Sequence, residues 1–541
     1  MGRSSGDGNA RVRNWREPTR WRCPRFGSKP SGLGRPLPWS VGADSTGSQG
    51  PAPAKVHLPA PGSPVVATGL DRRWTDEADR IEAEVAARIA PTAETVARVE
   101  RARRELVERV DAAARDRGSP LVRALVAGSA ARGTYLSDRL DIDLFLLFPP
   151  DLPRDRLREE GLALGGAVLT ETETRYAEHP YLRGRFAGFA VDAVPGYAVD
   201  DPSRPKSPVD RTPFHQAYLS ARETPELVAQ VRLAKQFFRA LGVYGSEART
   251  EGISGYLVEL LILHFGSLRG ILSAARSWRI PARIAAPALD PPRLPPDVAL
   301  ILADPVDPHR NVASALSRRN LGLLILAAGA YLAHPTPAWF EVVERAPLSR
   351  PAALARVAAR GTHVAVVALP RPANVVDDTL YPQLRKAERA IAEEADRADF
   401  PVLGSAGAVD AQRVLLLVEV THGHRPAVRP QDGPPAGLDR AAEYLAKWGV
   451  PEAPVLQGPY VRADGSLGVE TRRAERDLES VLRSALPTMS LGKDLALTGG
   501  RSAEVWALAE APEGPALARA RDDLLAKRLP WLPPPAPIEP L

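Results

Sequence analysis

The chain has 541 residues, 44% of them apolar and 25% charged, which is enough for roughly three to four domains of ~150 residues, each with a packed core. Its one cysteine, Cys23, excludes a disulfide within the chain and a zinc site built from cysteines. The net charge of +6 does not indicate nucleic-acid binding by the folded part, because residues 1–70 carry +7 and the remainder therefore about −1.

Residues 1–70 are rich in glycine, proline, serine and arginine and have no hydrophobic periodicity, so they are expected to be a disordered basic extension. Two alternatives stay open: a misplaced upstream start, since no methionine occurs between Met1 and Met489, or a basic arm that contacts RNA. The longest apolar run, residues 321–333, is shorter than the roughly 20 residues of a membrane span, and no signal-peptide core is apparent. These features predict a soluble, cytoplasmic protein.

The first ordered part of the chain is expected to combine helices with short strands. Apolar residues recur at helical spacing from Trp74 to Ile89 and, after the break at Pro91, from Val96 to Val110. Period-two patterns then predict strands over 121–127, 141–148, 168–176 and 189–194, with a helical turn over 128–133.

The middle third is expected to be helical and the last third to be α+β. Helices are predicted over 224–241, with Thr224 as the N-cap and Gly242 as the stop, and over 254–272 and 319–332. From about residue 346 the pattern alternates between strand and helix, over 362–369, 380–395, 414–420 and 439–447. This pattern is typical of a small α+β module, a kind that often presents a sheet to RNA.

Two aspartates, Asp141 and Asp143, lie two residues apart in an apolar strand, so both side chains point to the same face. Two close carboxylates repel one another and resist burial, and a divalent cation such as Mg²⁺ removes that cost. Asp192 lies in a later strand with similar apolar neighbours and is the candidate third ligand. Three such carboxylates suit two-metal phosphoryl transfer.

The segment before the aspartates has the composition of a phosphate-binding loop. Gly128 allows backbone N–H groups to approach a phosphate, Ser129 offers a hydroxyl, and Arg132 neutralises triphosphate charge. Taken alone, an Asp-x-Asp pair is usually a solvated strand edge, and a Gly-Ser pair is usually a plain turn. The combination with a later strand aspartate favours a nucleotidyltransferase site.

Residues 128–134 together with Asp141–Phe148 resemble the signature of the polymerase-β-type nucleotidyltransferase superfamily. The longer motif, Gly-Ser-x-x-Arg-Gly-Thr followed by Asp-Ile-Asp-Leu-Phe, is similar to the corresponding motif of the archaeal (class I) CCA-adding enzymes. The resemblance extends from about residue 72 to near the C-terminus. Further matching segments are 177–181, 191–195, 210–215, 235–237, 242–245, 304–307 and 310–313.

The resemblance implies template-independent addition of two CMP and one AMP to the 3′ end of tRNA, from CTP and ATP, with Mg²⁺ and release of diphosphate. It also suggests a homodimer. Arg310 would lie near the incoming base, and Glu178 and His179 near the RNA end. The implied metal ligands are Asp141, Asp143 and Asp192, and the implied triphosphate contacts are Ser129, Arg132, Thr212, His215, Lys235 and Tyr244.

Taken without the resemblance, several of these residues have ordinary alternatives. Lys235 can be an exposed lysine, His215 a capping or core histidine and Tyr244 a packing residue. Arg310 can form a surface salt bridge, and His179 can be a plain loop residue. In the C-terminal part, Tyr460, Arg462, Trp448, Arg472, Arg473 and Arg476 are candidates for RNA contacts, although a salt-bridged helix would equally explain the last three.

The predicted fold class is α+β, with a nucleotidyltransferase-type mixed-sheet head, a central helical domain and a C-terminal α+β RNA-binding body and tail. The expected boundaries are 1–70 for the extension, 71–210 for the catalytic head, 211–345 for the helical domain that completes the nucleotide site, and 346–541 for the tRNA-binding part. The alternative functions are a poly(A) polymerase, another nucleotidyltransferase such as one acting on antibiotics, and a non-catalytic RNA-binding protein with a degenerate head.

Overall fold

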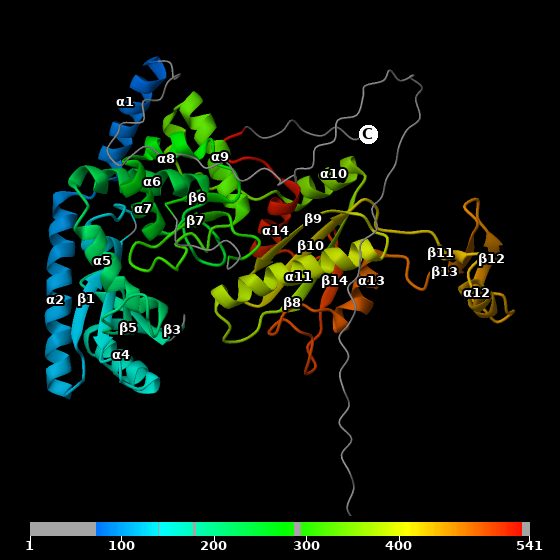
Figure 1. Cartoon of the computed structure of the whole chain (residues 1–541), viewed down its shortest axis with the longest axis horizontal. Helices are drawn as coiled ribbons and strands as arrows, with labels where there is room; N and C mark the ends of the chain where they lie inside the picture. Colours follow the sequence, from blue (N-terminus) through cyan, green and yellow to red (C-terminus); the bar gives the residue numbers. More distant parts are fainter. Residues whose placement is uncertain (1–71, 139, 177–179, 286–293, 533–541) are drawn as a thin grey trace, which may run out of the picture. The chain divides into compact units, whose positions relative to one another are not determined.

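The computed structural model describes residues 72–138, 140–176, 180–285 and 294–532, and Figure 1 shows their course. They form an α+β protein, as expected. Within these residues no single helix is long and apolar enough to cross a membrane, and one bent pair, α7 (Gly255–Phe265) with α8 (Leu268–Ala275), passes that test jointly.

The head contains a five-stranded mixed sheet in the order β1-β2-β5-β4-β3. β2 and β5 are parallel, whereas the other neighbours are antiparallel. Its strands are β1 (Arg123–Ala127), β2 (Asp141–Phe148), β3 (Thr170–Tyr176), β4 (Pro180–Phe186) and β5 (Phe189–Tyr197).

One face of this sheet is covered by α2 (Ala93–Arg117) and α4 (Arg154–Val168). Ile142 and Leu144 of β2 point into the core beneath these helices, together with Val191 of β5. Because strand side chains alternate, the residues between them face the other way. The helices therefore leave the face that carries the predicted aspartates open to other groups.

The helical part has a large apolar core in which Phe237 and Phe238 are fully buried. Thr224 caps α6 (Pro225–Leu241) through a bond from the Leu227 N–H, and Gly242 ends it, as predicted. Its other helices are α1 (Arg72–Ile89), α5 (Thr212–Ser220), α7, α8 and α9 (Arg318–Ala333), and its two short strands are β6 (Ala282–Ile284) and β7 (Leu300–Leu302).

The single helix predicted over 254–272 is wrong, because the segment forms two helices, α7 and α8, bent by 88°. Gly266 adopts a left-handed conformation, φ 79°, and ends α7, while the Ser267 side chain caps α8. The apolar periodicity continues across the break because both helices face the same core.

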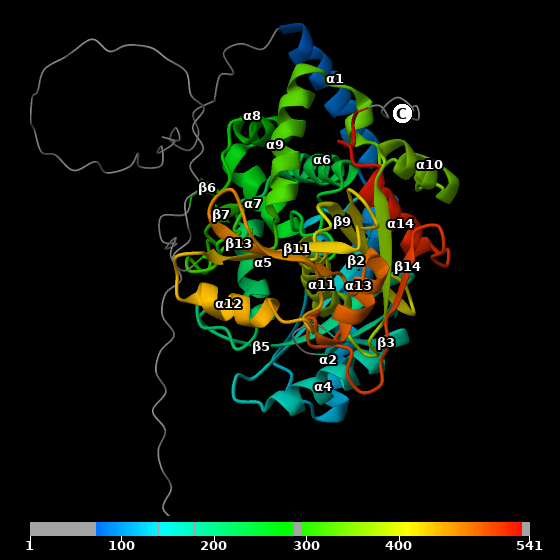
Figure 2. The ribbon, with the colours of Figure 1, turned by 90° about the vertical axis from the view of Figure 1, so that its right-hand side faces the viewer.

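The C-terminal part is organised around a four-stranded antiparallel sheet in the order β14-β8-β10-β9. The alternate residues of β8 face two cores, one formed with α11 and α13 and the other with α10 and α14. Figure 2 gives a second view of these elements. Their bounds are β8 (His363–Pro370), β9 (Val402–Val409), β10 (Arg413–Val420), β14 (Glu504–Ala507), α10 (Arg350–Arg360), α11 (Asp377–Arg397), α13 (Leu478–Ala485) and α14 (Pro515–Leu525).

A smaller three-stranded sheet, in the order β11-β13-β12, is inserted between β10 and α13 together with helix α12 (Arg440–Trp448). The alternative of a salt-bridged helix at Arg472–Arg476 is wrong, because Arg472 ends β13 and α13 begins only at Leu478. The three strands are β11 (Val428–Pro435), β12 (Val455–Val461) and β13 (Ser466–Arg472).

Candidate active site

The three predicted aspartates meet on the face of the head sheet that α2 and α4 leave uncovered. Asp143 of β2 is the direct partner of Asp192 in the parallel β2–β5 register, and Asp141 lies two residues earlier on the same strand. Burial raises the pKa of Asp143 to about 6, with further contributions from the charges of Asp192 and Asp141. Burial likewise raises the pKa of Asp192. The site therefore holds three like charges that the protein only partly compensates.

A fourth charged residue, Arg183 of β4, contacts two of the aspartates. It is the antiparallel partner of Asp192, so Asp143, Asp192 and Arg183 follow one another across three strands. Its guanidinium lies 3.2 Å from Asp192 Oδ2 and 3.4 Å from Asp141 Oδ1.

The three aspartates offer oxygen ligands of the kind that a divalent cation requires. No group of three histidine, cysteine or acidic side chains in the described ranges is arranged as a ready metal site. However, the buried Asp192 Oδ1 has no hydrogen-bond partner among the described residues, and carboxylates are the oxygen ligands that such cations prefer. The donor set therefore fits a cation once the side chains rearrange around it.

Gly128 brings the loop into close contact with the acids. It has φ 69°, and an added Cβ would overlap with Asp143 Oδ2, so only glycine fits without a shift. Ser129 follows as the second residue of the one-turn helix α3 (Gly128–Arg132) and is partly buried. The start of the predicted phosphate loop therefore lies directly against one of the predicted metal ligands.

Two predicted triphosphate contacts, Arg132 and Lys235, belong to a buried ion-pair cluster centred on Glu259 of α7. Arg132 lies 2.6 Å from Glu259 Oε2, and the Lys235 ammonium lies 3.5 Å from Glu259 Oε1. Thr134 donates to Glu259 Oε1 at 2.7 Å and accepts from Lys235 at 3.1 Å. Burial lowers the pKa of Lys235 and raises that of the adjacent Glu223 to about 7. Lys235 is therefore not the exposed lysine of the alternative reading.

A second buried carboxylate, Asp304, contacts three side chains of the helical part. His215 Nε2 lies 2.9 Å from it, Arg310 donates at 2.7 Å, and the Tyr256 hydroxyl donates at 3.0 Å. The rings of His215 and Tyr256 stack with centroids 4.1 Å apart. Burial opposes ionisation of Asp304, but hydrogen bonds from His215, Val306 and Arg310 bring its pKa down to about 2. Asp304 is therefore an ionised anchor.

The remaining predicted residues are placed less tightly. Thr212 is the first residue of α5, which also carries His215. Tyr244 and Lys235 meet near Gly255, where an added Cβ would lie 3.3 Å from the Tyr244 hydroxyl and 3.9 Å from the Lys235 nitrogen. The predicted RNA-end pair, Glu178 and His179, lies outside the described residues.

The sequence analysis missed the roles of Arg183, Glu259 and Asp304. Glu259 had a detectable signal, because it is the one acid in the otherwise apolar stretch of α7. Asp304 belongs to a matched segment, but nothing in its spacing indicates its partners. No pattern in the sequence indicated the role of Arg183. Arginine is common on strands, and the pairing of Arg183 with Asp192 depends on the register of β4 against β5.

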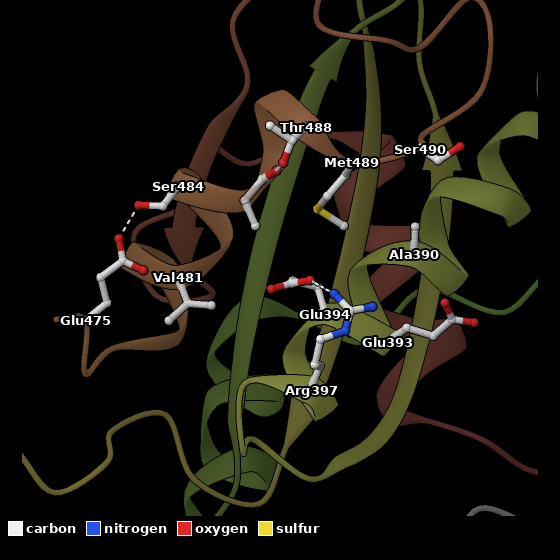
Figure 3. A pocket seen from close by; sticks show the side chains of 11 residues that line it. Ala390, Glu393, Glu394, Arg397, Glu475, Val481, Ser484, Thr488, Met489 and Ser490 are labelled. Atoms are coloured by element: carbon white, nitrogen blue, oxygen red, sulfur yellow. Dashed lines mark hydrogen bonds and ion pairs between the residues drawn. The ribbon is translucent and has the colours of Figure 1, made fainter. Parts of the chain in front are cut away.

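Two surface hollows differ in their relation to these residues. One, of about 480 Å³, is lined by Arg132, Glu223 and Arg232 and lies beside the Glu259 cluster. The other, of about 550 Å³, lies between α11 and α13 and contains none of the predicted site residues. Figure 3 shows that the acids lining it are partly paired within it, Glu394 with Arg397 and Glu475 with Ser484.

Comparison with known families agrees with this arrangement. Residues 107–215 match the model of the nucleotidyltransferase domain, residues 229–341 that of the second domain of tRNA nucleotidyltransferase, and residues 360–505 that of the CCA-adding enzyme C-terminal domain. A CCA-adding enzyme of Haloarcula marismortui is 38% identical over 432 residues, which cover 76% of this chain and 90% of that protein. This chain belongs to the CCA-adding enzyme family.

More distant members of the CCA-adding enzyme family show the same extent of similarity. The enzyme of Thermoplasma acidophilum is 32% identical over 76% of this chain and 91% of its own length. The enzyme of Methanocaldococcus jannaschii is 34% identical over 69% of this chain and 84% of its own length. The nucleotidyltransferase domain generally uses divalent metal ions.

Solved structures match about half of the chain. The structure of CdnC from E. coli MS115-1 with ATP has a TM-score of 0.37 and 20% identity, and covers 48% of this chain and 94% of that chain. A structure of the Cid1 poly(U) polymerase with Mg²⁺ and 3′-dATP has a TM-score of 0.37 and 14% identity, and covers 49% of this chain and 99% of that chain.

Proposed function

We propose that this protein adds the CCA sequence to the 3′ end of tRNA, using CTP and ATP as substrates and Mg²⁺ as the metal. The observation that carries the proposal is the meeting of Asp141, Asp143 and Asp192 on one face of the sheet, against Gly128, in a chain of this family. A second feature, the two buried carboxylates that hold candidate nucleotide contacts, supports it.

The metal would be held by Asp141, Asp143 and Asp192, with Asp192 Oδ1 as the oxygen that still lacks a partner among the described residues. When bound, divalent cations supply charge stabilisation to the attacking and leaving oxygens of an in-line displacement. Asp192 is also the candidate residue for activating the RNA 3′-hydroxyl, together with the metal that it would hold.

The triphosphate would bind at Gly128 and Ser129, with Arg132, Lys235, Thr212 and Tyr244 around it. Glu259 keeps Arg132 and Lys235 within one cluster, so neither needs to be ordered when the nucleotide arrives. His215 and Arg310, held by Asp304, would contact the nucleotide on its other side, with Arg310 nearest the base. Glu178 and His179 would lie near the RNA end.

The chain is proposed to divide its work among three parts. Residues 71–210 would carry the catalytic carboxylates, residues 211–345 would complete the nucleotide site, and residues 346–541 would hold the tRNA. Tyr460 on the small sheet and Arg462 directly after it are candidate RNA contacts. Arg462, Arg473 and Arg476 each already donate to a backbone carbonyl, and Arg462 also pairs with Asp432. A homodimer is proposed as the oligomeric state, and light scattering after gel filtration tests it.

The decisive experiment incubates the full chain with tRNA that lacks CCA, with CTP and ATP singly and together, and sequences the tRNA 3′ ends. Ordered addition of two C and one A, abolished in Asp141→Ala, supports the proposal. Long tracts made from ATP alone would indicate a poly(A) polymerase. Retained tRNA binding without incorporation under any metal would indicate a non-catalytic RNA-binding protein.

A further inference from the structure

Arg183 lies in the same row of residues across the sheet as Asp143 and Asp192. On β4 it lies directly opposite Asp192, which in turn lies directly opposite Asp143 on β2. One guanidinium therefore faces the carboxylates of two different strands, at 3.2 Å from Asp192 and 3.4 Å from Asp141. These residues are two of the three carboxylates assigned to the metal, although on Asp192 the guanidinium faces Oδ2 and leaves Oδ1 without a partner among the described residues.

We propose that Arg183 is a built-in counter-ion that competes with the divalent cation for Asp141 and Asp192, and so sets the affinity of the site for metal. The inference rests on the proposed metal site. It assigns Arg183 a positioning and tuning role and not a chemical one.

The competition follows from charge. A cation bound by Asp141 and Asp192 and the Arg183 guanidinium are attracted by the same two negative charges, so each weakens the binding of the other even where they use different oxygen lone pairs. Arg183 also cannot lose its charge, because the guanidinium stays protonated in proteins. A metal that binds must therefore separate Arg183 from the acids or tolerate its positive charge nearby.

The surroundings of Arg183 permit this separation. Its side chain is 30% exposed, so the guanidinium can rotate toward solvent while the strand stays in place. The compensation that it provides is incomplete, because Asp192 Oδ1 remains buried without a partner among the described residues.

Arg185 provides a matched control. It lies two residues later on β4 and therefore points to the same face, yet it pairs weakly with Glu171 at 3.9 Å and donates to the Gly188 carbonyl. It contacts none of the three aspartates in the described contacts. Arg183→Gln and Arg185→Gln each remove one positive charge from β4. Only Arg183→Gln removes a charge that lies beside the aspartates.

The test measures metal binding without turnover. The full chain is stripped with EDTA and titrated with Mn²⁺ alone, and free Mn²⁺ is followed by electron paramagnetic resonance. Arg183→Gln should bind Mn²⁺ about tenfold more tightly than the native chain, whereas Arg183→Lys and Arg185→Gln should stay within about threefold of it. Equal or weaker binding by Arg183→Gln would overturn the inference.

Thermal stability is a second readout, and in Arg183→Gln it should fall while the affinity for metal rises. In EDTA, Arg183→Gln should lower the thermal unfolding midpoint by about 2 °C, because three acids then repel one another without a counter-ion, while Arg185→Gln should leave it unchanged. A purely structural arginine would reduce stability and metal affinity together. Asp192→Asn separates the two proposals: if it binds Mn²⁺ as tightly as the native chain, the metal site itself is wrong, and this inference fails with it.

Discussion

The carboxylate face of the head and the Glu259 cluster contain the same kinds of side chains but balance their charges differently. Around Glu259, two acids, Glu259 and Glu223, face two cations, Arg132 and Lys235, inside the protein. On the carboxylate face, Arg183 pairs with two of the three aspartates, and one buried oxygen is left without a partner among the described residues. The first arrangement balances two negative charges with two positive ones, although Arg132 Nε and Glu223 Oε1 form no hydrogen bond among the described residues, whereas the second leaves negative charge for a ligand to neutralise.

The largest effect is expected from Asp143→Asn, which removes one of the three acids. Nucleotide incorporation should fall by about 10³-fold or more, since metal-assisted charge stabilisation contributes several kcal/mol. A steady-state incorporation assay on tRNA lacking CCA measures this. Near-native turnover in this variant would remove Asp143 from the chemistry.

The pH dependence of stability in Asp143→Asn also tests how the carboxylate face balances its charges. The folded-state pKa of Asp143, about 6, lies above the unfolded value, so the native state binds the proton more tightly. This group therefore lowers stability by its full amount above about pH 6, and the penalty is relieved as the pH falls from about 7 to about 4, near the unfolded value of 3.8. Asp143→Asn should be at least as stable as the native chain at pH 7 in EDTA, and should lack this part of the pH dependence in thermal unfolding.

The next effect concerns the contact between the loop and the acids. Gly128→Ala places a methyl group where Asp143 Oδ2 lies, so the carboxylate must move, and incorporation should fall by about 10²-fold. Gly133→Ala is the control, because Gly133 has almost the same φ, 68°, and open space around the added Cβ. It should cost only about 1 kcal/mol of stability from backbone strain. Equal losses of activity in both variants would contradict the close-contact argument.

Glu259→Gln tests the balanced cluster. Removing one member of a buried ion pair costs about 3 kcal/mol or more, because Arg132 and Lys235 are left without their shared counter-charge. Urea unfolding should show this loss, and the KM for both nucleotides should rise about tenfold as the two cations lose their positions. Exposed Glu226 on α6 is the control, and Glu226→Gln should change neither quantity.

The smallest effect is expected from Asp304→Asn. The loss of the ionised anchor should loosen Arg310 and His215 and raise the KM for nucleotide about fivefold, with kcat less affected. Asp307→Asn is the matched control, since Asp307 is equally buried, lies three residues away and pairs with Arg211 instead. The native pairing of Asp304, with its pKa near 2, adds stability above pH 4 that is lost as the pH falls toward 2. Unequal KM values in the two variants support Asp304 as the anchor.

The head and the first helices were predictable because their signals are local. Alternation predicted β2 and β5, and the cap at Thr224 and the stop at Gly242 delimited α6. The prediction failed at Gly266, where one core accepts two helices with continuous periodicity. It also missed β4 and β9, because polar or small residues along those strands hide the alternation.

For the site, the amino-acid sequence by itself determined that Asp141 and Asp143 share a face, that Gly128 precedes them in a phosphate-binding loop, and that the chain resembles the CCA-adding enzymes. Only the tertiary structure decided that Asp192 is the neighbour of Asp143, that Arg183 follows it, and that Glu259 and Asp304 hold the cations. The physical reason is how far apart in the sequence the interacting residues lie. Side-chain alternation along one strand is local, whereas the pairing of strands and the sharing of the Glu259 charge depend on residues up to 127 positions apart.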